Sequence, residues 1–168
     1  VDEKDAEYAI DKNDFSVTIN DQKITFDCVF NAIHGTPGED GLMQAYFELL
    51  GIPQSSCDYY QSALTFNKRD LLSVLKPYGI KTALSYLLNQ GDSKNTKEII
   101  KRVGLPCFVK PNRSGSSFGI SMVKESVDLI TAIENAFKED NEIIIESYLK
   151  GTEVSVGVIN YQGEIIVL

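Results

Sequence analysis

The sequence predicts a mixed fold of the α/β (α+β) class, and three observations support this prediction. Short apolar runs typical of strands recur along the 168 residues, and helical periodicity occurs between them. After Gly104 the predicted order is strand, loop, strand, helix, strand, which indicates an antiparallel sheet covered by a helix. The first third of the chain has instead the pattern of the end of an α/β unit.

The first third of the chain contains a predicted hairpin, a buried strand and a helix. Phe15, Val17 and Ile19 alternate with polar residues, which is the period of a half-buried strand. The next apolar run has almost no polar residue, which favours a parallel strand buried on both faces. The predicted elements are strands over 15–19 and 23–26, the parallel strand over 28–33, a glycine-rich loop over 34–41 and a helix over 42–50.

The remainder of the chain alternates short helices with strands. Ser126 is expected to cap a helix whose apolar side chains recur on one face. The predicted elements are helices over 62–66 and 71–75, a β-rich stretch over 81–88, a helix over 96–103, strands over 105–109 and 120–124, a helix over 127–138, and strands over 142–146, 153–159 and 164–168. Because the last strand reaches the final residue, we expect the chain to be part of a longer protein.

Composition and charge exclude several classes of partner. The net charge of −8 argues against non-specific binding to nucleic acid or to an anionic membrane surface. No apolar run approaches the ~20 residues of a membrane span, and the acidic segment 1–5 lacks the apolar core of a secretory signal. The cysteines Cys28, Cys57 and Cys107 are expected to be reduced and mostly buried. Together these features predict a cytoplasmic protein without a zinc site, since a single histidine accompanies no C-x-x-C pair.

The most informative segment is 109–119, Val-Lys-Pro-Asn-Arg-Ser-Gly-Ser-Ser-Phe-Gly. Lys110 follows an apolar strand, and the loop after it contains Ser116, Ser117 and two glycines. Such a loop can bring backbone N–H groups and hydroxyls close to a phosphate group. The lysine precedes the glycines, so the spacing differs from that of the P-loop. Taken alone, the segment could equally be an ordinary hairpin turn.

Three further segments carry charged groups beside predicted turns. Lys68 lies at a predicted helix start, and segment 146–153 leaves a buried strand and turns at Gly151. Segment 34–44 begins with the glycine-rich loop, which contains His34 and Glu39. Two lysines can neutralise a triphosphate from two sides. Taken singly, each segment has a plainer interpretation: a surface lysine, solvated surface acids, and a histidine at a strand end that serves the structure alone.

Together the four segments resemble the D-alanine–D-alanine ligase family of the ATP-grasp superfamily. Segment 34–44 is similar to the family pattern H-G-x-x-G-E-D-G-x-x-Q, and segment 109–119 to V-K-P-x-x-x-G-S-S-x-G. Segment 146–153 resembles E-x-aromatic-L-x-G-x-E, and Lys68 follows a Ser-Ala-Leu run as in the family. The order and the gaps agree along nearly the whole chain. Thr36 and Pro37 depart mildly from the family pattern.

The resemblance implies an ATP-grasp fold in three parts. These parts would be the end of an N-terminal α/β pre-ATP-grasp domain that binds substrate (1–56), the central small ATP-grasp domain (57–146) and the start of the C-terminal domain (147–168). The chain is thus expected to lack family features at both ends. It also follows that the chain alone is not expected to catalyse ligation.

The resemblance also implies roles for individual residues. Lys68 and Lys110 would bind the phosphates of ATP, and Ser116 and Ser117 would cover the phosphate that is transferred. Ser116, His34 and Glu39 would be the catalytic residues, with His34 and Glu39 facing the amino acid. The remaining nucleotide contacts would be Glu146, Tyr148 and Leu149 at adenine and Glu153 at the ribose.

The implied reaction joins two D-alanines through an acyl phosphate, for peptidoglycan synthesis. It uses ATP with Mg²⁺ or Mn²⁺, whose ligands are expected beyond Leu168, and the family resemblance suggests a homodimer. Two alternatives stay open from the sequence. One is a D-alanine–D-lactate-type ligase that shares these motifs, and the other is a non-catalytic ATP-grasp module that binds nucleotide.

Overall fold

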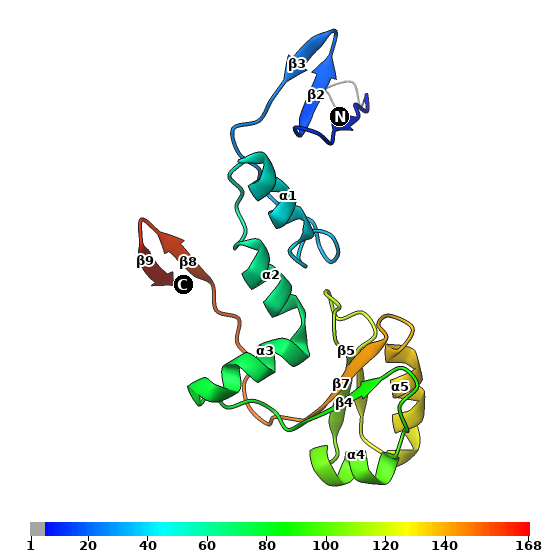
Figure 1. Cartoon of the computed structure of the whole chain (residues 1–168). Coiled ribbons are helices and arrows are strands. Elements are labelled where there is room, and N and C mark those ends of the chain that lie inside the picture. The colour runs from blue at the N-terminus through cyan, green and yellow to red at the C-terminus, as the bar shows by residue number, and fades with distance from the viewer. Residues whose placement is uncertain (1–5) are drawn as a thin grey trace.

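The structure of the chain, a computed structural model, describes residues 6–168 (Figure 1). Residues 1–5, which begin the predicted first domain and carry the acidic N-terminal segment, lie outside the described residues. The elements are β1 (Ile10–Asp11), β2 (Ser16–Ile19), β3 (Gln22–Ile24), α1 (Leu42–Leu50), α2 (Tyr59–Phe66), α3 (Lys68–Leu75), the 3₁₀ turn η1 (Lys76–Tyr78), β4 (Ser85–Asn89), α4 (Thr96–Val103), β5 (Cys107–Pro111), β6 (Ser121–Val123), η2 (Ser126–Asp128), α5 (Leu129–Ala136), β7 (Glu142–Ser147), β8 (Val158–Tyr161) and β9 (Glu164–Val167).

The N-terminal hairpin is confirmed and packs on α1 through aromatic rings. β2 pairs antiparallel with β3, and the short β1 adds a third strand. The ring of Phe15 lies 4.8 Å from that of Phe47, a side chain that is almost fully buried, and 5.7 Å from that of Phe26. Edge-to-face contacts of this kind stabilise a small sheet that has little core of its own.

The predicted buried strand over 28–33 is wrong. The segment is extended, but its pairing is limited to one parallel bridge between Val29 and Gln54, and the side chain of Phe30 is 83% exposed. An apolar run forms a strand only where a neighbouring strand supplies hydrogen bonds and a packed face. Within residues 6–168 no strand lies alongside this run. The parallel direction of the bridge agrees with the prediction.

Three consecutive helices connect the N-terminal hairpin with the larger sheet (Figure 1). The predicted helix over 42–50 is confirmed with the same bounds, and Gly51 ends it with φ 69°. α2 and α3 are longer than predicted, because Asp58 and Asn67 cap them at the N-terminus by accepting hydrogen bonds from the N–H groups of Gln61 and Asp70. Lys68 is therefore the first residue of α3.

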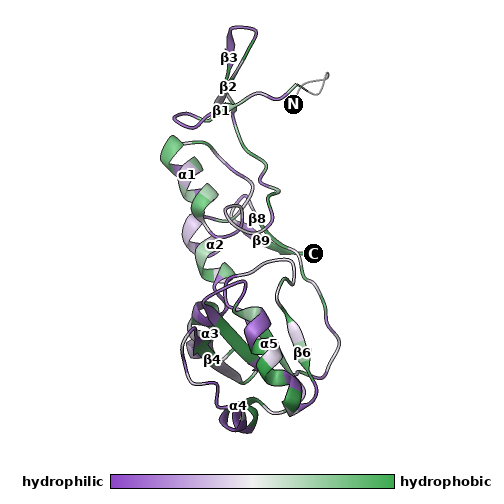
Figure 2. Ribbon diagram, turned by 90° about the vertical axis from the view of Figure 1, so that its right-hand side faces the viewer, coloured by the Kyte–Doolittle hydropathy of each residue, from purple (hydrophilic) through white to green (hydrophobic). Residues whose placement is uncertain are grey.

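The larger sheet has the order β4-β7-β5-β6, and all of its neighbours are antiparallel. α4 and α5 cover one face, as Figure 2 shows from the side where α5 lies over the strands. The core between them consists of Leu88, Ile99, Val103, Cys107, Val109, Val123, Leu129, Ala132, Ile133, Ala136, Ile143 and Ile145. The predicted antiparallel sheet with a packed helix is thus confirmed, and α4 adds a second helix.

The strand register determines which side chains point away from this core. Phe108 pairs with Glu146, and Lys110 pairs with Ile144. Because side chains alternate along a strand, these four residues share the face that α4 and α5 do not cover. The predicted functional side chains Lys110 and Glu146 therefore lie on that second face.

Several predicted boundaries need correction. The strand predicted over 105–109 is β5 at Cys107–Pro111, so Lys110 lies inside the strand near its end. Ser126 does not cap a helix: it begins the 3₁₀ turn η2, and Glu125 precedes it as the N-cap residue, with no side-chain cap. The strand predicted from 153 begins at Val158, where β8 and β9 form a separate hairpin of mostly exposed residues.

The cysteines differ from the prediction in their burial. Cys107 is buried in the core, whereas Cys28 and Cys57 are exposed, and all three are free thiols. Burial among apolar side chains raises the pKa of the Cys107 thiol. The prediction that they are reduced holds in this structure, but the prediction that most of them are buried is wrong.

Candidate functional site

The second face of the larger sheet presents an ion pair between two predicted site residues. The Lys110 Nζ donates to the Glu146 Oε2 at 2.8 Å, and the Glu146 side chain is only 13% exposed. The two residues are diagonal neighbours on β5 and β7, where long side chains on one face reach each other. The ammonium also lies 5.5 Å from the centroid of the Phe108 ring. The lysine is thus held over the sheet rather than free in solvent.

A cleft of about 670 Å³ opens over this face. It contains six of the residues that the sequence predicted to bind nucleotide, namely Lys110, Ser117, Glu146, Tyr148, Leu149 and Glu153. Residues from the segment before β4, from β5 and from the exit of β7 also contribute to its walls. A concave site of this size, with an apolar floor and a few charged groups, is typical of small-ligand binding.

The loop over 112–119, here called the serine loop, contributes Ser117 to the wall of the cleft. Ser116 and Ser117 both have positive φ, 48° and 61°, which is uncommon for residues other than glycine. Within residues 6–168 neither backbone N–H group has an acceptor, so both are free to donate to a ligand. Ser117 faces this cleft, whereas Ser116 faces a second, smaller pocket.

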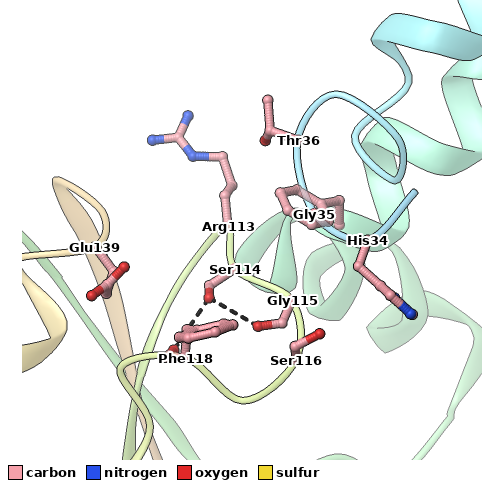
Figure 3. Close-up of a pocket in the computed structure, with 10 residues that line it drawn as sticks. His34, Gly35, Thr36, Arg113, Ser114, Gly115, Ser116, Phe118 and Glu139 are labelled. Carbon is pink, nitrogen blue, oxygen red and sulfur yellow. Dashed lines mark hydrogen bonds between the residues drawn. The ribbon is translucent and has the colours of Figure 1, made fainter. Parts of the chain in front are cut away.

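That second pocket, of about 220 Å³, lies between the serine loop and the loop of His34 (Figure 3). The Glu39 Oε2 accepts a 2.6 Å hydrogen bond from the Gly35 N–H, and the His34 Nδ1 lies 3.9 Å from the Glu39 Oε1. A Cβ atom at Gly115 would come within 2.8 Å of the Glu39 Oε2. The two loops, far apart in the sequence, therefore approach each other so closely that a larger residue at 115 would displace the Glu39 carboxylate.

Lys68 lies behind the serine loop rather than in the cleft. Its Nζ donates to the backbone oxygens of Ser114 at 2.9 Å and of Asn112 at 3.3 Å. Partial burial and the charge of Lys110 lower its pKa from the ordinary value of 10.5, although Glu146 opposes this. The two ammonium groups are thus close enough to repel each other. An anion bound between them would be attracted to both and would offset that repulsion.

Some residues of this region were missed by the sequence analysis. Phe108 lines the cleft beside Lys110, and its ring lies 6.2 Å from that of Tyr148, so the two form an aromatic wall. The alternation along β5 could have placed Phe108 on the face of Lys110. Asn112, buried at the start of the serine loop, gave no signal in the sequence beyond its place after Pro111.

Neither a metal centre nor a membrane span is found in the part of the chain that the structure describes. Residues 6–168 contain no group of three or more His, Cys, Asp or Glu side chains that could hold a metal ion. None of their helices combines the length and the apolar character needed to cross a membrane. The predicted metal ligands, which would lie beyond Leu168, stay a prediction.

Solved structures of ligases share this fold. D-alanyl-alanine synthetase A from Vibrio cholerae matches with a TM-score of 0.86 and 29% identity, over 98% of this chain and 50% of the other. The VanG D-Ala:D-Ser ligase from Enterococcus faecalis matches with 0.81 and 36%, over 96% and 47%. The D-alanine–D-alanine ligase from Bacillus anthracis, solved in complex with ATP, matches with 0.67 and 35%, over 75% and 42%.

Curated relatives are more similar in sequence. The D-alanine–D-alanine ligase of Flavobacterium johnsoniae is 80% identical over all 168 residues, which make up 52% of its own length. That of Christiangramia forsetii is 66% identical over 164 residues, 98% of this chain and 50% of the relative. The chain therefore spans about half the length of the curated relatives it matches.

The family models match two separate parts of the sequence. The model described as D-ala D-ala ligase N-terminus matches residues 2–57, and the one described as D-ala D-ala ligase C-terminus matches residues 74–168. Together with the shared fold and the converging segments, these matches show that the chain belongs to the D-alanine–D-alanine ligase family.

Proposed function

We propose that this chain supplies the nucleotide cleft and the phosphate-covering loop of an ATP-dependent ligase that joins two D-alanines. In the proposed reaction one D-alanine carboxylate attacks the terminal phosphorus of ATP, forming an acyl phosphate and releasing ADP. The amine of a second D-alanine then attacks the acyl carbon and expels phosphate. Such chemistry depends on positioning and charge neutralisation more than on a nucleophilic side chain.

The observation that carries the proposal is the place of the serine loop. It separates a cleft that contains Lys110 from a pocket that contains His34, with Ser117 on one side and Ser116 on the other. A phosphoryl group that passes between a nucleotide and an amino acid must cross such a boundary. The unpaired backbone N–H groups of the two serines could donate hydrogen bonds to the phosphoryl group while it is being transferred.

The residues of this chain fit the parts of a nucleotide. Lys110 would contact the phosphates, with Lys68 approaching them from behind the loop. Tyr148 and the backbone of Leu149 would contact adenine, with Glu146 close by, and Glu153 would accept the ribose hydroxyls. Glu146 neutralises Lys110 at 2.8 Å, which reduces the cost of holding that ammonium over the sheet.

On the amino-acid side, the Glu39 carboxylate and the His34 ring would orient the first D-alanine. The serine loop would shield the acyl phosphate from water until the second amine attacks. A bound Mg²⁺ or Mn²⁺ would supply further charge neutralisation at the phosphates. The metal, a homodimeric assembly and a cytoplasmic setting belong to the same proposal.

D-alanine is favoured as the second substrate by the names of the curated relatives. Relatives from Flavobacterium johnsoniae and Christiangramia forsetii are called D-alanine–D-alanine ligases. A D-Ala:D-Ser ligase shares the same fold over 96% of this chain, so the fold of this region does not by itself select the second substrate. The selection would be made by residues elsewhere in a longer enzyme.

The test uses a chimera in which this chain replaces the matching half of the Flavobacterium johnsoniae ligase. We expect phosphate release that depends on both ATP and D-alanine. Lys110→Ala should lower kcat/KM by about two orders of magnitude, because it removes a charge from the phosphate site. Lys97→Ala, at an exposed position of α4, is the matched control and should have no effect.

Two outcomes would overturn the proposal. One is a chimera that binds ATP without turnover, which would favour the non-catalytic module. The other is a Lys110→Ala variant as active as the Lys97→Ala control. A faster reaction with D-lactate than with D-alanine would instead favour the D-alanine–D-lactate alternative.

A further inference from the structure

Asn112 is a buried amide at the start of the serine loop, and every hydrogen-bonding group of its side chain is used. The residue is 1% exposed. Its Oδ1 accepts from the Arg69 N–H at 2.8 Å, and its Nδ2 donates to the Asn67 Oδ1 and the Glu142 Oε2, both at 2.9 Å. A buried amide is tolerated only when it is satisfied in this way. Its three partners belong to α3, the residue before α3, and β7.

These bonds make Asn112 a second cap of α3. Asn67 caps the helix by accepting from the Asp70 N–H, and its Nδ2 donates to the Asp70 carboxylate at 2.7 Å. Asn112 satisfies the N–H of Arg69 in the same first turn, although it lies far away in the sequence. The first turn of α3, which contains Lys68, is thus joined to the serine loop by a hydrogen bond from a backbone N–H of the helix to the Asn112 side chain.

The backbone of Asn112 binds Lys68 directly. Its carbonyl oxygen accepts from the Lys68 N–H at 3.2 Å and from the Lys68 Nζ at 3.3 Å. On the other side its own N–H donates to the Glu142 carbonyl at 2.9 Å. The Arg69 guanidinium completes the connection by pairing with the Glu142 carboxylate at 2.8 Å. Asn112, Arg69 and Glu142 therefore contact one another pairwise and form a closed network.

From this geometry we propose that Asn112 is a positioning residue for Lys68. It holds the first turn of α3 against the serine loop and thereby sets where the Lys68 ammonium lies relative to Lys110. Asn112 does not line the nucleotide cleft and so acts through Lys68. The inference rests on the proposed function insofar as Lys68 binds phosphate, but the placement of Lys68 can be tested without any nucleotide.

The nucleotide-free test measures the pKa of Lys68 in this chain by ¹³C NMR of the lysine ε-carbons. In Asn112→Ala the Lys68 side chain should reach water and move away from Lys110, so its pKa should rise toward 10.5. Lys97 serves as the internal reference and should not change. An unchanged Lys68 pKa would overturn the proposal, whatever the activity of the chimera.

The kinetic test is a double-mutant cycle in the chimera. When Lys68 is present, we expect Asn112→Ala to raise the KM for ATP about tenfold. In the Lys68→Ala variant the same substitution should raise it less than about twofold, because the effects of two coupled residues on binding do not add. Ile133→Ala, in the core on α5, controls for lost stability and should leave the KM unchanged. Multiplicative effects, or an equal rise in the Ile133 variant, would contradict the proposal.

Should Asn112→Ala fail to fold, Asn67→Ala carries the same two measurements. It removes one of the two acceptors of the Asn112 Nδ2, the half-buried Asn67 side chain, and leaves the Glu142 carboxylate in place. The same rise in the Lys68 pKa and the same non-additivity are expected, and their absence would overturn the proposal. A wild-type chimera without ligase activity would refute the proposed function. The change in the Lys68 pKa would then still test whether Asn112 positions Lys68.

Discussion

At the scale of single residues, the candidate site depends on close approaches that the sequence could not reveal. His34, Glu39 and Ser116 were predicted from separate segments, each by its own pattern. That Gly115 lies against the Glu39 carboxylate follows only from the folded path of two loops. Lys110 and Glu146 were predicted as ligand contacts, but their mutual ion pair depends on strand register, which the apolar pattern did not specify.

Gly115→Ala is therefore expected to disturb the amino-acid side of the site. The new Cβ would meet the Glu39 Oε2 at 2.8 Å and displace a flexible carboxylate rather than the backbone. The hydrogen bond from the Gly35 N–H would be lost, and such a charged bond contributes about 1.5–3 kcal/mol. In the chimera we expect the KM for D-alanine to rise roughly tenfold. The affinity for ATP should stay as it was, and an unaltered KM for D-alanine would contradict the close approach.

At the scale of elements, periodicity predicted those strands and helices that pack against one another within residues 6–168. Ile143 and Ile145 of β7 and the amphipathic face of α4 lie in the core, where the sequence placed them. The run 28–33 has an equally apolar pattern but lacks a paired neighbour there. Ser126 failed as a cap because a 3₁₀ turn precedes α5, and cap residues favour several local structures equally well.

The turn between α5 and β7 is held by an ion pair whose strength should depend on pH. Burial alone would raise the pKa of the Asp140 carboxyl, but hydrogen bonds from the Arg113 side chain and from nearby backbone N–H groups outweigh it, so the pKa lies below 3.8. A carboxyl whose pKa is lower in the folded state stabilises the fold at every pH above its pKa in the unfolded chain. This contribution is lost as the pH falls through the pKa of the folded state.

Arg113→Met should remove most of this contribution. We expect the free energy of unfolding at neutral pH to fall by about 1 kcal/mol. The difference from wild type should shrink as the pH falls through the lowered pKa of Asp140, because the protonated carboxyl no longer pairs with Arg113. Urea titrations of the chain across this range measure it. Lys138→Met, which removes a nearby cation that donates to Asn135 rather than to Asp140, is the control. A difference that persists at low pH would refute the explanation.

At the scale of the whole molecule, packing is unevenly distributed. The larger sheet with α4 and α5 contains nearly all of the buried apolar side chains. The β8–β9 hairpin extends to one side, and most of its residues are exposed (Figure 1). The sequence predicted strands both in the larger sheet and in the β8–β9 hairpin, because the spacing of apolar residues indicates a strand but not which other elements cover it. The predicted domain boundaries at 56 and 146 stay predictions.

This uneven packing predicts an ordered series of hydrogen-exchange rates in the chain. Amides of β5 and β7 should exchange slowest, because they lie inside a four-stranded sheet and over a closed core. Amides of β8 and β9 should exchange fastest, since an isolated two-stranded hairpin is marginally stable in water. The β2–β3 hairpin should fall between them, because the ring of Phe15 packs on the buried Phe47. Mass spectrometry of peptides after exchange measures the series. Protection of β8 and β9 equal to that of β7 would mean that the hairpin is covered in solution, contrary to the packing described.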